Sequence, residues 1–291
     1  MFNPGAFIAG AIVVIACAFL SISGLLIVRK TVGTEKLEQF NNVGGNMFQV
    51  VGTLYAVLIG LIIVDAMQTL NDLRVTIDNE ASAVANIYTL AGGLPSEAKI
   101  KVQGLAVKYV DLVIDEEWKA MSHRTYSKGA IICVQGLWKT LIDCEPPKSA
   151  QENIRNMALG EMQNLSDSRR KRLLSSIHGT PPILWAALAL GGALTIMFTY
   201  FFSISSLFGQ IAMTAIVSTC LSLNIYLVYL FGYPFSGIFR LPPEGFIANR
   251  AIFNAFKNGI DSVPEGYDLQ KLKDNQGKLS PEDLKNLPQG R

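Results

Sequence analysis

The sequence has few of the side chains on which catalysis and metal binding usually depend. It contains only two histidines, His123 and His178, and its four cysteines form no CxxC pair. General acid–base chemistry near neutral pH relies mostly on histidine, and zinc sites need clustered cysteine or histidine ligands. The GxSxG, HExxH and glycine-rich nucleotide-binding patterns do not occur either. We therefore expect no catalytic residues, no metal centre and no cofactor.

Charge is also scarce, and its distribution is very uneven. Charged residues make up 16% of the chain against 50% hydrophobic residues, and the net charge is only +2. This composition is too apolar for an ordinary soluble domain and offers no basic surface for nucleic acid. The stretches 1–28, 39–64 and 179–239 carry no charge at all.

The three uncharged stretches are long enough for four membrane crossings. One transmembrane helix needs about 20 apolar residues, so the first two stretches hold one crossing each and the third holds two. We expect a break at 202–206 between the last two crossings. The predicted transmembrane helices are 6–28, 46–66, 182–202 and 208–231.

A polar block separates the second predicted span from the third. Its apolar residues recur at helical spacing without any β alternation, and turn-forming segments at 92–95 and 145–147 divide it into helices. The predicted fold class is an all-α membrane protein with four transmembrane helices and a helical cytoplasmic domain inserted between the second and third. The predicted domains are 1–66 (transmembrane helices 1 and 2), 67–178 (cytoplasmic domain), 179–232 (transmembrane helices 3 and 4), 233–256 (interfacial segment) and 257–291 (polar, partly disordered tail).

The basic residues near the membrane predict the orientation. Four crossings place both termini and the block on one side, which carries seven membrane-proximal basic residues against three on the other. The positive-inside rule then predicts a multi-pass protein with both termini cytoplasmic. Arg29 and Lys30, directly after the first span, favour the opposite orientation, in which Cys133 and Cys144 could form a disulfide.

The second predicted span carries polar side chains that need partners in hydrocarbon. At 100° per residue, five small or polar residues fall within an arc of about 80°. Such a stripe can pack against neighbouring helices, or it can line a water-filled path through an oligomer. The five candidate pore-lining residues are Asn46, Gln49, Thr53, Ala56 and Gly60.

Charged residues near the ends of the spans have alternative interpretations. Asp65 lies about 28 Å along the helix axis from Asn46. It is either an acid at the inner mouth of a path, an ordinary helix-end carboxylate, or a partner of Arg74 or of the basic cluster 169–172. A basic cluster precedes the third span and is expected to contact anionic membrane lipids, or alternatively another subunit. The cluster consists of Arg169, Arg170, Lys171 and Arg172.

Three further segments remain open on the sequence alone. The acidic run 115–117 is a solvated helix face, a vestibule lining or a partner of the basic cluster. The phenylalanine-rich segment 233–256 lies at the membrane surface or docks against the block. Hydroxyl residues of the fourth span, at 214, 218 and 222, are expected to pack against neighbouring helices.

Several stretches resemble the bestrophin-like family of bacterial membrane proteins. They are NNVGG…VGTLYAVLIG, EASAVANIYTLAGGLP, YVDLVIDEEW, SDSRRKRL and GYPFSGIFRLPPEGF, which together cover most of residues 1–250. The resemblance implies a homo-oligomer, with a pentamer as the expected assembly, a pore lined by the second span, anion selectivity and a bacterial inner-membrane location. True bestrophins bind calcium through acids that follow an Asn-Pro-Phe sequence. Here SGIFRLPP follows Tyr233-Pro234-Phe235, so we expect no calcium site.

Two functions are compatible with this sequence. The first is a homo-oligomeric ion channel for inorganic ions, with the second span lining the pore and the cytoplasmic helices forming a vestibule. The alternative is a membrane-anchored oligomeric scaffold or sensor whose cytoplasmic domain binds partners. Replacing Gln49 or Thr53 with leucine separates the two, because only a channel would lose current.

Overall fold

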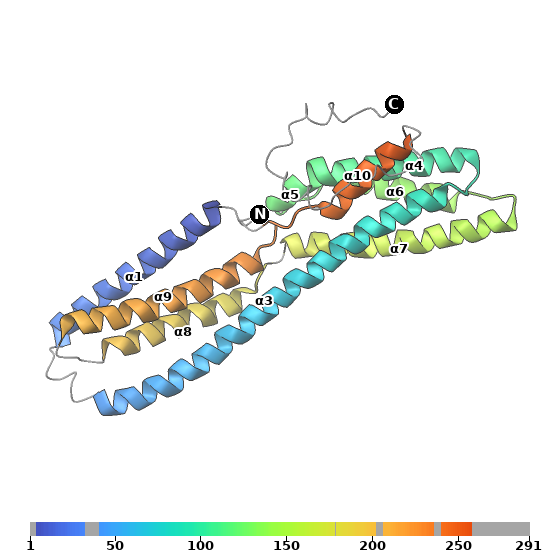
Figure 1. Ribbon diagram of the computed structural model, residues 1–291. Helices are drawn as coiled ribbons and strands as arrows, with labels where there is room; N and C mark the ends of the chain where they lie inside the picture. The colour runs from blue at the N-terminus through green and yellow to red at the C-terminus, as the bar shows by residue number, and fades with distance from the viewer. Residues whose placement is uncertain (1–3, 33–40, 178, 202–205, 236–239, 258–291) are drawn as a thin grey trace.

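The computed structural model describes residues 4–32, 41–177, 179–201, 206–235 and 240–257, and these residues form helices without any β-strand. Figure 1 shows two helical bundles placed end to end. One bundle contains α1 (Pro4–Val32), α8 (Pro182–Tyr200) and α9 (Leu207–Gly232). The other, called the block below, contains α4 (Ser96–Leu112), a π-helical segment (Val113–Glu117), α5 (Trp118–Ser122), α6 (Lys128–Ile142), α7 (Ser149–Ile177) and α10 (Glu244–Lys257).

The four predicted spans are confirmed as four helices that are long and apolar enough to cross a membrane. Three of them coincide with α1, α8 and α9, and the second lies in the first part of α3 (Asn41–Ala91). The break predicted at 202–206 falls mainly outside the described residues, as does the predicted tail beyond residue 257. The side of the membrane on which the block lies stays a prediction.

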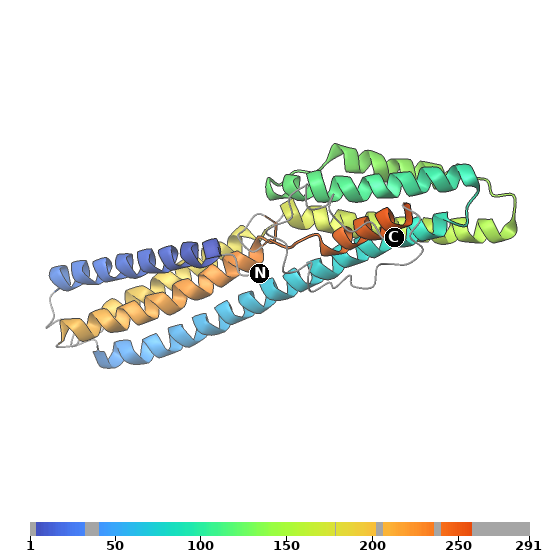
Figure 2. The same ribbon diagram turned by 45° about the horizontal axis from the view of Figure 1, so that its top comes forward.

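Helix α3 is continuous for 51 residues and belongs to both bundles. At 1.5 Å per residue it is about 76 Å long. The predicted domain boundary at 66/67 lies inside this continuous helix. No glycine or proline occurs between residues 61 and 91 to interrupt it. Both views show α3 running from the far end of the membrane bundle into the block (Figures 1 and 2).

The block has its own hydrophobic core, formed by α3, α4, α6 and α7. The predicted breaks at 92–95 and 145–147 are confirmed, because α3 ends at Ala91 and α6 ends at Ile142. Apolar residues of the helical pattern are fully buried, among them Val102, Leu137 and Leu165. Not every apolar residue of these helices is buried, since Met157 on α7 is exposed.

Helix α10 docks on the block through its apolar face. Phe253 stacks on Tyr88 with the ring centroids 4.1 Å apart, and the Asn249 amide donates a hydrogen bond to the Ala81 carbonyl at 2.6 Å. Phe246 is fully buried beside Tyr109. Of the two possibilities for 233–256, docking is therefore the one the structure shows. The block covers Phe246 and Phe253 of α10, and the placement of 233–256 at the membrane surface stays a prediction.

The membrane helices pack through small residues and short hydrogen bonds, as is usual for helices in lipid. Tyr55 of α3 lies against Gly191 of α8, where an added Cβ would come within 2.3 Å of the tyrosine ring. The Tyr55 hydroxyl donates a hydrogen bond to the Leu188 carbonyl at 2.7 Å. Thr214 and Ser218 of α9 are buried, which agrees with their predicted packing role.

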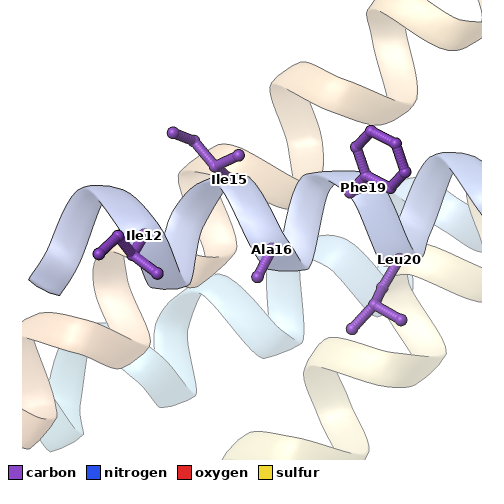
Figure 3. Close-up of a pocket in the computed structure, with 5 residues that line it drawn as sticks. All are labelled: Ile12, Ile15, Ala16, Phe19 and Leu20. Carbon is purple, nitrogen blue, oxygen red and sulfur yellow. The ribbon is translucent and has the colours of Figure 1, made fainter.

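The outward surface of α1 is apolar and carries no candidate site. Figure 3 shows a shallow hollow on this helix, and its exposed side chains match the hydrocarbon that surrounds a membrane span. It offers no polar group that would orient a ligand. The hollow is lined by Ile12, Ile15, Ala16, Phe19 and Leu20.

Candidate functional site

The small and polar stripe predicted on the second span lies on a part of α3 that no helix of the same chain covers. Gln49, Thr53, Ala56 and Gly60 are all exposed, and we call these four residues the uncovered face. A Cβ added at Gly60 would meet no heavy atom within 4 Å. The side chain of Asn46, the fifth predicted residue, lies outside the described ones.

The opposite side of α3 holds the helix against its own chain. The side chains of this side are buried, and the exposed fractions of Tyr55, Ile59 and Ile62 are only 5%, 6% and 6%. At 100° per residue, their mean direction differs by about 120° from that of the uncovered face. The packing of Tyr55 against Gly191 therefore determines the direction in which the uncovered face points.

Leucines occupy another part of the exposed surface of α3, about 120° from the uncovered face on the helical wheel. Leu54 and Leu61 are 67% and 65% exposed. Large apolar side chains of this kind fit lipid or the helices of another subunit, whereas hydrocarbon offers the Gln49 amide no hydrogen-bond partner. The exposed surface of α3 thus has one small and polar side and one leucine-rich side.

The chemistry of the uncovered face is neutral. The Thr53 hydroxyl donates to the Gln49 carbonyl at 2.7 Å, so the threonine oxygen can still accept a hydrogen bond on its outer side. The Gln49 amide offers both donors and an acceptor. Side chains of these types can replace water around an ion of either sign, so they do not by themselves determine selectivity.

Asp65 is exposed on α3, near the point where the helix passes from the membrane bundle into the block. On the helical wheel its direction differs by about 150° from the mean direction of the uncovered face. Within the described part of the chain it forms no ion pair. The pairing with Arg74 or with the basic cluster, which the sequence left open, is therefore not observed.

The predicted basic cluster divides into two buried and two exposed side chains. Arg169 is 6% exposed and Arg172 is fully buried, and both pair with acids of the same chain. The contact with lipid or with another subunit was therefore wrong for these two arginines. Their positions on the inner side of α7 bring them into the core. Arg170 and Lys171 are exposed, and for them the contact stays a prediction.

A buried network of charged groups lies at the centre of the block. The Arg172 guanidinium donates to both oxygens of Glu80, at 2.6 and 2.7 Å, and to Glu117 at 2.8 Å. Arg169 pairs with the other oxygen of Glu117, and the Tyr109 hydroxyl donates to Glu80. Two acids thus balance two arginines, which is the condition under which charges are tolerated in a protein interior.

A π-helical segment directs Glu117 into this network. The segment covers Val113–Glu117 and interrupts an otherwise regular helix. Its wider turn changes the register of the acidic run, so that Glu117 is buried while Glu116 is exposed. For Glu117 the structure shows the pairing with the basic cluster that the sequence left open.

The surroundings of the network shift the pKa values of Tyr109 and Arg172. Burial raises the pKa of Tyr109 well above its ordinary value, and the nearby Glu80 carboxylate raises it further. Burial alone would lower the pKa of Arg172, but the Glu80 carboxylate raises it well above the ordinary value. Tyr109 therefore stays a neutral donor and Arg172 stays charged throughout the neutral pH range.

Sequence reasoning missed Glu80 and Tyr109 as members of this network, although a signal was present. Glu80 lies between Ile77 and Val84 on the buried side of α3, and Arg172 occupies a corresponding position on α7. A charged residue on a core-facing position requires a buried partner of opposite sign. That rule would have predicted buried pairing, without giving the partner's identity.

Comparison with protein families matches residues 14–246 to the bestrophin-like domain. The chain belongs to the bestrophin-like family. Comparison with curated proteins and with solved structures gives no match. Membership confirms the resemblance found in the sequence and identifies this chain as a bestrophin-like membrane protein.

In this bestrophin-like chain the network joins the segments that connect block and membrane. Glu80 lies on α3, and Arg172 lies on α7, which leads into α8. The ring of Trp118 lies 5.3 Å from the Arg172 guanidinium, and its indole N–H donates to the Leu241 carbonyl at 2.8 Å, in the connection between α9 and α10. Buried contacts thus link all three connections between the block and the membrane bundle.

The described residues contain no group of three or more histidine, cysteine or acidic side chains placed to hold a metal ion. The four cysteines are free, including Cys133 and Cys144. Two features of the described part of the chain thus stand out, the uncovered face of α3 in the membrane bundle and the charge network in the block.

Proposed function

We propose that this bestrophin-like protein assembles into a homo-oligomeric ion channel in which the uncovered face of α3 lines the path. The single observation that supports it most is the exposure of Gln49, Thr53, Ala56 and Gly60 on a membrane helix whose opposite side is packed. Hydrocarbon cannot satisfy a glutamine amide, so water at a shared axis of several subunits is the favourable environment.

The arrangement of the single chain supports the proposed assembly. Copies arranged around an axis would present Asn46 and the uncovered face inward, with the block forming a vestibule and Asp65 near the inner mouth. The resemblance to bestrophins, which are oligomeric and ion-conducting, supports five subunits, inorganic ions as cargo and a bacterial inner membrane. We place both termini and the block on the cytoplasmic side, according to the positive-inside rule.

Replacing Gln49 or Thr53 with leucine tests this function in planar lipid bilayers. Conductance is expected to fall about tenfold, because losing one hydrogen bond of about 1.4 kcal/mol to a permeating ion changes its population by that factor. Ser23→Leu on α1 is the matched control, since its hydroxyl also bonds only a carbonyl of its own helix. Equal currents from all three variants and the wild type would contradict the proposal.

A second candidate function is a membrane-anchored scaffold or sensor. It is favoured by apolar side chains on the surface of the block, where Ile100 and Ile132 are 73% and 66% exposed. Exposed isoleucines of this size fit a protein partner. A scaffold would keep its partner when Gln49 or Thr53 is replaced by leucine, and it would show no current at all.

A further inference from the structure

We propose that the turn between α5 and α6 binds anionic phospholipid headgroups of the leaflet that faces the block. The turn, taken here with the adjoining ends of both helices as residues 119–128, carries three exposed basic side chains, Lys119, Arg124 and Lys128. Tyr126 at its tip is 51% exposed. This inference requires only that the four apolar helices cross a membrane, and it holds for a channel and a scaffold alike.

The backbone of the turn has a conformation that arginine does not favour. The Arg124 N–H donates to the Met121 carbonyl at 3.0 Å, and the Thr125 N–H donates to the Ala120 carbonyl at 3.1 Å. This pair of bonds ends a helix with one residue in the left-handed region, a position normally taken by glycine. Arg124 occupies it with φ of 58°, the only positive value of a non-glycine residue in the described ranges.

An arginine in this position costs backbone free energy that glycine would avoid, because its Cβ crowds the neighbouring carbonyl. Residues in such conformations occur preferentially at functional sites, where another interaction offsets the cost. For Arg124 that interaction must involve the side chain, since the two backbone hydrogen bonds would form equally well with glycine. The location of the side chain therefore indicates its function.

The Arg124 side chain lies at the boundary between the membrane helices and the block. Its guanidinium lies 5.9 Å from the ring centroid of Tyr233, the residue that directly follows α9. Tyr233 in turn contacts Tyr229 at 5.4 Å and Trp185 at 6.5 Å between ring centroids. Tyrosine and tryptophan gather at the membrane–water interface. Figure 1 shows α5 at the end of the block nearest to α9.

The basic residues of the turn retain their charge for an external partner. Of the three acids that precede it, Asp115 pairs with Arg250 at 3.2 Å and Glu117 is buried in the charge network. Glu116 is exposed and accepts a hydrogen bond from the Ser127 hydroxyl at 2.8 Å. Three positive charges against one exposed acid leave the turn basic. A basic, tyrosine-tipped turn beside an aromatic girdle matches the surface of an anionic leaflet.

The test measures binding of phosphatidylglycerol and phosphatidylcholine to the purified full-length protein by native mass spectrometry. The triple variant K119Q/R124Q/K128Q is expected to lower affinity for phosphatidylglycerol about a hundredfold, or about fivefold for each charge. Affinity for phosphatidylcholine should not change. The control K99Q/K101Q/K139Q removes the same charge from exposed sites toward the far end of the block and should bind like the wild type.

Three outcomes would overturn the inference. Phosphatidylglycerol affinity could be unchanged in the triple variant, or it could fall equally in the control, which would indicate a general effect of net charge. It could also depend only on Arg170 and Lys171, measured with the variant R170Q/K171Q. The last result would place the lipid contact on α7 and not on the turn.

Arg124→Gly separates lipid binding from folding. Glycine removes the cation and the backbone cost together, so the unfolding temperature in phosphatidylcholine nanodiscs should be unchanged or higher. Affinity for phosphatidylglycerol should nevertheless fall about fivefold. A lower unfolding temperature with unchanged phosphatidylglycerol affinity would show that Arg124 serves only to pack on Tyr233, and would contradict the inference.

Discussion

Replacing Arg172 with methionine is expected to lower the free energy of unfolding by about 3–5 kcal/mol, because the change leaves buried carboxylates without their partner. Glu80 would lose both of its hydrogen bonds from the guanidinium, and Glu117 would keep only Arg169. Methionine fills a similar volume, so the effect would come from charge and not from a cavity. Urea unfolding in detergent micelles, followed by tryptophan fluorescence and circular dichroism, measures the change.

The control for this prediction lies two residues earlier on the same helix. Arg170 is exposed and pairs with none of the buried acids. Arg170→Met should therefore change the free energy of unfolding by less than about 0.5 kcal/mol, the usual range for a surface substitution. Similar unfolding midpoints for both methionine variants would show that the buried network does not stabilise the block.

Gly60→Phe is expected to abolish conduction while leaving the fold of the subunit intact. A Cβ at this position meets no atom of the same chain within 4 Å, so a larger side chain has room in the single subunit. In the proposed assembly every copy would place one phenyl ring at the axis, and these rings would close the path to hydrated ions. Single-channel recording in planar bilayers measures the loss of current.

Leu61→Phe provides the matched comparison for the pore block. Leu61 is the next residue along α3 and is 65% exposed, but it lies on the leucine-rich side. The same phenylalanine side chain at this position should leave conduction close to that of the wild type. If both phenylalanine variants assemble and conduct equally well, Gly60 does not face the path.

The membrane part of the fold was predictable because hydropathy alone determines it. Uncharged stretches long enough to cross a bilayer gave four helices at nearly the observed positions. The block was predictable at the level of helices and breaks, since glycine and proline at 92–95 and 145–147 end helices whatever surrounds them. Hydropathy and the residues that end helices are both local properties of the chain.

The features that could not be predicted from the sequence depend on contacts between distant segments. Glu80 and Arg172 are 92 residues apart, and their pairing follows from the antiparallel packing of α3 and α7. The π-helical segment adjusts one helix to its neighbours and has no composition of its own. Helix α10 looked equally suited to lipid and to the block, because both accept the same aromatic face.

The candidate site shows the same division between local and distant information. The helical period placed Gln49, Thr53, Ala56 and Gly60 on one side of a helix, and this depended on sequence alone. Which side the rest of the chain would cover depended on Tyr55 and Gly191, which are brought together only in the folded structure. Exposure of the stripe is thus the new information that the structure contributes.

The most direct test is reaction of single cysteines on α3 with a water-soluble, charged thiol reagent. The reagent is applied to the protein in lipid bilayers, in a background without the two native membrane cysteines. Thr53→Cys and Gly60→Cys should be modified, with a change in current, whereas Leu54→Cys and Leu61→Cys should stay unmodified. If the leucine positions react and the threonine and glycine positions do not, the uncovered face does not line a water-filled path.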